Sequence, residues 1–132
     1  MKLSFIPVII FDFLKETGLK NLYFQPGKKE VNNYLGDAKK TYVIESMVTK
    51  SPVQLIEKIN VPRLEKILVD LFCDKDLLYA YQGSELSNIF QKAFSTYALN
   101  ISSLVNYSRR RAREKELIDF IKNKVGIKLP VL

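Results

Sequence analysis

The spacing of the apolar residues changes near the middle of the chain, and this change constrains the fold more than any other feature. Before residue 50, short apolar runs are separated by glycine, proline and polar residues, which is typical of short strands alternating with helices. After residue 60, apolar residues recur three and four positions apart, which is typical of amphipathic helices. The clearest stripe of this kind comprises Leu64, Ile67, Leu68, Leu71 and Phe72.

The first half reads as an alternation of strands and helices. We expect strands at 3–6, 21–25 and 40–46, and helices at 8–17 and 28–35. Gly18 and Gly36 follow the two helices, where a left-handed residue commonly ends a helix. Strand–helix–strand connections of this length favour a small, mainly parallel sheet of three to four strands with covering helices.

The second half reads as four helices. Pro62 suits the first turn of the first helix, because its missing N–H has no partner there. Ser84 is the expected N-cap of the second helix, with Glu85 in its first turn, and Asn100 or Ser102 is expected to cap the third. The expected inward faces of the last three helices are Leu86, Ile89, Phe90, Ala93, Phe94 and Tyr97; Ile101, Leu104, Val105 and Ser108; and Leu117, Ile118, Ile121 and Val125.

Together these patterns predict an α/β (α+β) fold. The three- to four-stranded, mainly parallel sheet comes from residues 1–50, and it packs against a helical half formed by residues 51–132. A chain of 132 residues without repeats or an obvious linker is expected to form a single domain, 1–132.

The composition argues against an enzyme. The chain has no histidine, one cysteine (Cys73) and five scattered glycines, so it lacks the usual general base, the usual zinc ligands and a phosphate-cradling loop. We therefore expect no catalytic residue, metal or cofactor. The apolar run 5–11 is too short to span a bilayer and ends at Asp12, so we expect no membrane segment, with a signal peptide as the alternative. A lone Cys73 favours a soluble protein of the reducing cytoplasm.

One catalytic alternative remains, a magnesium-dependent nuclease. Asp37 and Lys39 stand at the acidic-x-Lys spacing of such sites, and Glu45 follows on the next expected strand as a possible second ligand. The same residues also read as an ordinary turn before a strand.

Positive charge is concentrated in the last quarter of the chain. Residues 101–132 hold eight basic and three acidic side chains. The densest stretch contains Arg109, Arg110, Arg111, Arg113 and Lys115, which we expect on one continuous helix with a local Arg110–Glu114 pair. Three interpretations stay open: a solvated face neutralised by nearby carboxylates, contact with an acidic protein partner, or contact with the phosphate backbone of DNA or RNA, with Tyr97 and Tyr107 as stacking surfaces.

The helical half resembles a known family. The run from Pro62 to Asp70 matches the P-x-x-E-K/R-x-L-V-D helix of AbiEi-type antitoxins from bacterial type IV toxin–antitoxin systems. The likeness continues through Tyr81-Gln82-Gly83-Ser84-Glu85, Ile89-Phe90, Tyr97, Asn100 and Tyr107-Ser108-Arg109-Arg110-Arg111. It covers about residues 40–122, and the first strand–helix unit more loosely.

The resemblance implies a non-enzymatic, toxin-neutralising and regulatory domain whose partner is a nucleotidyltransferase-like toxin. Members of that family also carry an N-terminal winged helix that binds operator DNA, and the present sequence shows no such segment. The resemblance implies structural roles for Pro62, Leu64, Glu65, Leu68, Asp70, Gly83, Glu85 and Tyr107, with Glu65 and Asp70 holding the arginines of the later helices. It implies partner or nucleic-acid contact by Arg109, Arg110, Arg111, Arg113 and Lys115.

Overall fold

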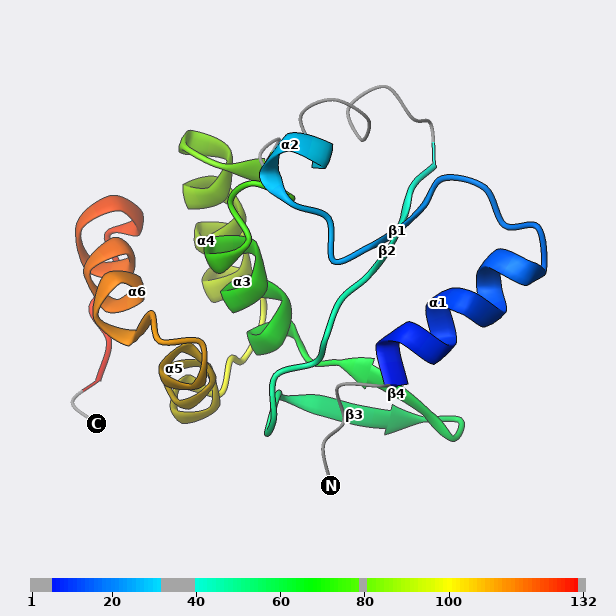
Figure 1. Cartoon of the computed structure of the whole chain (residues 1–132). Helices are drawn as coiled ribbons and strands as arrows, with labels where there is room; N and C mark the ends of the chain where they lie inside the picture. The colour runs from blue at the N-terminus through cyan, green and yellow to red at the C-terminus, as the bar shows by residue number, and fades with distance from the viewer. Residues whose placement is uncertain (1–5, 32–39, 79–80, 131–132) are drawn as a thin grey trace. The chain divides into compact units, whose positions relative to one another are not determined.

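The computed structural model describes residues 6–31, 40–78 and 81–130, and it divides the chain into two compact units, Met1–Met47 and Val48–Leu132 (Figure 1). Both units contain helices and strands, which confirms the α+β class. The expected mainly parallel sheet is confirmed in part, because the described residues of the first unit form one parallel strand pair. A second, antiparallel pair lies in the second unit and was not expected.

The first unit is built on a short parallel strand pair. Helix α1 (Ile6–Glu16) is followed by β1 (Leu22–Phe24), α2 (Lys28–Glu30) and β2 (Tyr42–Ile44). Strand β1 pairs in parallel with β2, with Tyr23 opposite Val43, as the alternation predicted. The ring of Phe11 on α1 packs 5.6 Å from that of Phe24 on β1.

The predicted helix ends and strands of this unit are partly confirmed. Gly18 has φ +84°, so it adopts the expected left-handed conformation after α1. The expected strand 3–6 lies outside the described residues except for Ile6, which is the first residue of α1. The expected helix 28–35 is described only as far as Val31, and Gly36 lies outside the described residues.

The second unit begins with a β-hairpin that the periodicity analysis missed. Strands β3 (Val53–Ile56) and β4 (Ile59–Pro62) pair antiparallel through a two-residue turn. Both turn residues, Glu57 (φ +49°) and Lys58 (φ +67°), have positive φ, as a type I′ turn requires. Pro62 is the last residue of β4 opposite Val53 and not part of a helix, so that prediction is wrong; a proline is tolerated in an edge strand.

The rest of the second unit is helical, as predicted. The helices are α3 (Leu64–Cys73), α4 (Ser84–Thr96), α5 (Ile101–Arg110) and α6 (Glu114–Phe120), and α6 continues as a π-helical turn over Ile121–Val125. Their shared core is centred on fully buried Leu68, Val69, Phe90, Leu104, Leu117 and Ile121. The helix pattern therefore identified most of the core.

Four details of the expected helices are wrong. Ile67 is 42% exposed and Tyr97 is 61% exposed, whereas Val69, which was outside the expected stripe, is buried. Gly83, and not Ser84, is the N-cap of α4, and its φ of +67° gives it the conformational role expected for a glycine.

Asn100 caps α5 as predicted, because its side-chain oxygen accepts from the Ser103 N–H at 2.9 Å.

Candidate binding site

We expected the arginine-rich segment on one continuous helix, and this prediction is wrong. The segment forms a corner between α5 and α6. Ala112 adopts a left-handed φ of +57°. Its N–H donates to the Arg109 carbonyl, and the Arg113 N–H donates to the Ser108 carbonyl, both at 2.9 Å. These are the two hydrogen bonds of a Schellman motif, with alanine at the position where glycine is usual. We call residues 109–113 the arginine corner.

The corner directs Arg111 toward α3. Its guanidinium donates to Asp70 at 2.8 Å and to Asp74 at 2.6 Å, and its side chain is 19% exposed. Burial by itself would lower the pKa of Arg111, but the hydrogen bond to Asp74 and the charges around it raise this pKa above its ordinary value. Arg111 is therefore held by carboxylates of its own fold, and the partner contact predicted for it stays a prediction.

Asp70 is the centre of the contacts that fasten α5 to α3. Besides the Arg111 bond, it accepts from the Tyr107 hydroxyl at 2.6 Å and from Lys66 at 2.5 Å. Lys66 also donates to the Tyr107 hydroxyl at 3.2 Å and lies over the tyrosine ring. Although burial lowers the pKa of Lys66, its hydrogen bonds to Asp70 and Tyr107 raise it overall. The expected role of Asp70 in holding the arginines is confirmed.

Glu65 has a different role from the one expected. Its side chain is buried, and one carboxylate oxygen accepts from the Asn100 N–H at 2.8 Å, so it holds the start of α5 and not an arginine. Leu68 is fully buried, Leu64 packs at the edge of the core, and Glu85 lies in the first turn of α4 as expected. The residues that carry the family resemblance thus lie mainly in the framework of α3, α4 and α5.

The other arginines of the corner lie at the surface. Arg109 forms a two-pronged pair with Glu114, at 2.8 and 2.7 Å, so the predicted Arg110–Glu114 pair is wrong. The hydrogen bond between them raises the pKa of Arg109 and lowers that of Glu114. Arg110 instead donates to the Thr49 carbonyl at 3.3 Å and to the Thr49 hydroxyl. Arg113 and Lys115 are exposed.

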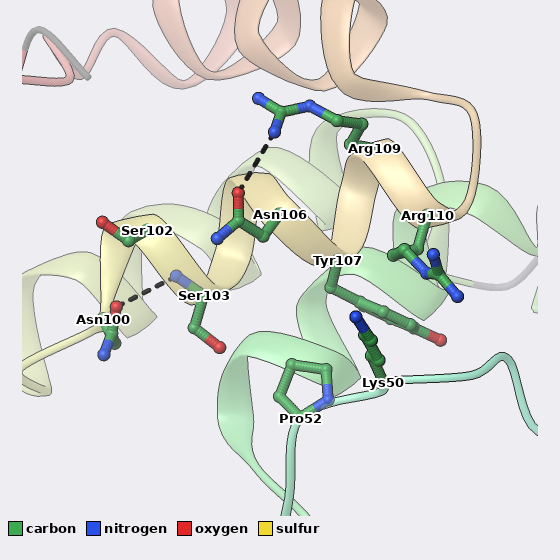
Figure 2. Close-up of a pocket in the computed structure, with 9 residues that line it drawn as sticks. All are labelled: Lys50, Pro52, Asn100, Ser102, Ser103, Asn106, Tyr107, Arg109 and Arg110. Atoms are coloured by element: carbon green, nitrogen blue, oxygen red, sulfur yellow. Dashed lines mark hydrogen bonds between the residues drawn. The ribbon is translucent and has the colours of Figure 1, made fainter.

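An open recess of about 590 Å³ lies along α5 beside these arginines (Figure 2). Figure 2 shows Lys50 and Pro52 on one segment facing the side chains of α5. We call this pocket the basic recess; its lining residues are Lys50, Pro52, Asn100, Ser102, Ser103, Asn106, Tyr107, Arg109 and Arg110. Three of them are basic and none is acidic.

Sequence reasoning missed Lys50, Asn106 and the serines of this recess. Lys50 is 60 residues from Arg110, and hydrogen bonds from Arg110 to Thr49 link the two segments. The one local signal was a polar stripe on α5, formed by Asn100, Ser103, Asn106 and Arg110.

The nuclease alternative receives no structural description, because Asp37 and Lys39 lie outside the described residues. Within the residues that the structure does describe, no group of three or more cysteine, aspartate or glutamate side chains could hold a metal ion. In the same part of the chain, no helix is long and apolar enough to cross a membrane.

The arrangement is therefore a framework of buried polar contacts that exposes a basic, donor-rich recess at one end. No curated protein and no solved structure shows a significant match to this chain. A family model does match, over residues 8–127 and hence both structural units. The chain belongs to the family of unknown function DUF6577.

Proposed function

We propose that this chain is a non-enzymatic binding domain of antitoxin type that neutralises a nucleotidyltransferase-like toxin by direct contact. The contact surface in this proposal is the exposed part of the arginine corner together with Lys50. A cytoplasmic location is part of the proposal, because it suits a free Cys73 and an intracellular toxin.

The observation that carries the proposal is that the arginines differ in whether the fold neutralises their charge. Arg111 is held by two carboxylates of α3, whereas Arg110 and Arg113 have no carboxylate partner among the described residues. Positive charges that the fold does not neutralise are available to an acidic partner. They increase the rate at which such a partner associates, and they repel proteins with a basic surface.

The resemblance to AbiEi-type antitoxins gives the second line of support. Asp70, Tyr107 and Arg111 belong to the matching segments, and they contact one another across α3 and α5. Residues that match in sequence and also fasten the two helices together support a shared framework. The step from a shared framework to a shared partner is an analogy, and it needs its own test.

Co-expression with a nucleotidyltransferase-like protein encoded beside this chain tests the proposal. We expect the native chain to restore growth and to co-purify with the toxin. The double variant Arg110→Glu/Arg113→Glu should lose both properties, because it changes the net charge of the contact surface by −4. Lys122→Glu/Lys124→Glu makes the same change in charge on exposed residues of the π-helical turn and should still neutralise. Failure of every form to bind the toxin or to restore growth would refute the proposal.

A nucleic-acid-binding function is the second candidate, and it is favoured by the absence of acidic residues from the lining of the basic recess. In the basic recess and the arginine corner, Lys50, Arg110 and Arg113 have no carboxylate partner among the described residues. Three phosphate contacts would give a slope of about −2 to −3 in a plot of log affinity against log salt concentration. A salt-independent affinity for single-stranded DNA, or none, would exclude this candidate.

A further inference from the structure

The basic recess has an uncompensated charge of about +2, although three basic residues line it. Arg109 is neutralised by its two-pronged pair with Glu114. Lys50 and Arg110 have no carboxylate partner among the described residues. The Arg110 guanidinium is fixed to Thr49, the residue immediately before Lys50, so both cations belong to the same end of the recess.

The neutral side chains of the recess present hydrogen-bond donors. The Asn106 side-chain oxygen accepts from Arg109 at 3.4 Å, and the Asn100 side-chain oxygen accepts from the Ser103 N–H at 2.9 Å. Because an amide has one oxygen and one NH₂ group, each asparagine is left with its NH₂ group for a ligand. The hydroxyls of Ser102 and Ser103 can donate as well. A ligand rich in acceptor oxygens fits such a lining.

From this chemistry we propose that the basic recess binds a phosphate monoester of a polar organic molecule. A phosphate monoester carries a charge of about −1.5 to −2 near neutral pH, which matches the two uncompensated cations, whereas a single carboxylate carries −1. Its three terminal oxygens also accept more hydrogen bonds than a carboxylate does.

The basic recess has room for more than a phosphate ion. Its volume of about 590 Å³ is within the range of about 300–1,000 Å³ that is usual for small-molecule sites. Ser103 and Arg110 are separated by about 10 Å along α5, given a rise of about 1.5 Å per residue. The phosphate is placed at the Lys50–Arg110 end, and the organic group lies toward Ser102, Ser103 and Asn106. This ligand differs from the protein partner proposed above; the two share Lys50 and Arg110, but neither proposal rests on the other.

A titration of the purified, isotopically labelled chain followed by two-dimensional amide NMR tests the site. The probes are adenosine 5′-monophosphate, inorganic phosphate, adenosine and glutarate, at constant ionic strength. We expect the monophosphate to shift the amide signals of residues 49–52 and 100–110 saturably, with inorganic phosphate weaker and adenosine without effect. Unsaturable or scattered shifts would overturn the proposal, and equal affinity for glutarate would identify a carboxylate site instead.

The variants are chosen so that the fold survives. Lys50 has φ +60°, a conformation that asparagine adopts readily, so Lys50→Asn removes the charge and keeps the turn. With Arg110→Met it should weaken monophosphate binding about ten-fold or more, because two charge-assisted contacts are lost. Arg110→Lys should weaken binding less, and Lys122→Asn/Lys124→Met should leave it unchanged. Unchanged affinity in the Lys50→Asn/Arg110→Met chain would refute the assignment. Since no toxin is present, this result is separate from the test of the antitoxin function.

Discussion

Replacing Asp70 by asparagine tests whether the contacts between α3 and α5 stabilise the second unit. Asp70 accepts hydrogen bonds from Lys66, Tyr107 and Arg111, and the side chains of the two cations are only 16% and 19% exposed. Asparagine keeps one acceptor for the Tyr107 hydroxyl but loses the negative charge between the cations. Arg111 retains Asp74, at 2.6 Å.

The magnitude follows from the partial burial of the two cations. A hydrogen bond to a charged group contributes about 1.5–3 kcal/mol when buried, and an exposed ion pair about 0–1 kcal/mol. Asp70→Asn weakens two such contacts in a mostly buried position, so we expect the free energy of unfolding to fall by about 2–3 kcal/mol. The melting temperature should fall by about 8 °C or more.

Urea unfolding at pH 7, followed by far-ultraviolet circular dichroism, measures this loss. Asp119→Asn is the matched control, because it removes the same charge from an exposed residue of α6 and should change the stability by less than about 0.5 kcal/mol. If Asp70→Asn lowered the free energy of unfolding no more than this control does, the contacts around Asp70 would not stabilise the fold. Combining Asp70→Asn with Arg111→Met should give a smaller loss than the two single losses added together, because both remove the same contact.

Four further outcomes are expected. Ala112→Gly should raise the free energy of unfolding by about 1 kcal/mol in the same urea assay, because glycine adopts the left-handed conformation of the arginine corner without the strain of a Cβ; no gain would contradict the Schellman geometry. Lys58→Gly in the hairpin turn should also stabilise, by about 0.5–1 kcal/mol in the same assay, because glycine adopts a left-handed conformation without strain; a loss of stability would contradict this. Leu104→Ala should cost about 2–5 kcal/mol, because Leu104 is fully buried in the core, and a loss below 1 kcal/mol would show that it is not. Burial raises the pKa of Cys73, so its reaction with a thiol reagent should be slow at pH 7 and should accelerate at a higher pH than that of a free cysteine; fast labelling at pH 7 would contradict this.

The apolar periodicity predicted the helices and most of the core, because a buried face must recur with the helical repeat. Leu68, Phe90, Leu104 and Leu117 all lie where that repeat places them. Ile67 fails because it lies at the margin of the stripe, where local packing decides exposure and the pattern does not.

Two backbone reversals could not be predicted because their residues are unusual. The hairpin turn has Glu57 and Lys58 where asparagine and glycine are the common signal, and the arginine corner has Ala112 where glycine is usual. The hairpin turn is closed by the antiparallel pairing of β3 with β4, and at the arginine corner Arg111 is held by Asp70 and Asp74. The missed corner explains the wrong Arg110–Glu114 pair, since a continuous helix would have placed those two residues on one face.

The basic recess could not be predicted from the sequence, because its lining residues come from two segments that are far apart in the chain. Its polar stripe on α5 was visible, but Lys50 comes from a segment that periodicity assigned to the boundary between two halves. Similarly, the contacts of Asp70 with Tyr107 and Arg111 span 37 and 41 residues. The family resemblance indicated that Asp70 would hold an arginine, but it could not say which of the four.

The alanine-centred turn follows three adjacent arginines, so the length of that run affects which arginine pairs with Asp70 and Asp74. Deleting one arginine would leave a sequence that looks almost unchanged to composition or charge analysis. The arginine that reaches Asp70 and Asp74 would then come from the neighbouring position, and the basic recess would lose a cation. Under the proposed phosphate site, homologues with two or four arginines here should therefore differ in their affinity for a phosphate monoester even where every other residue is the same.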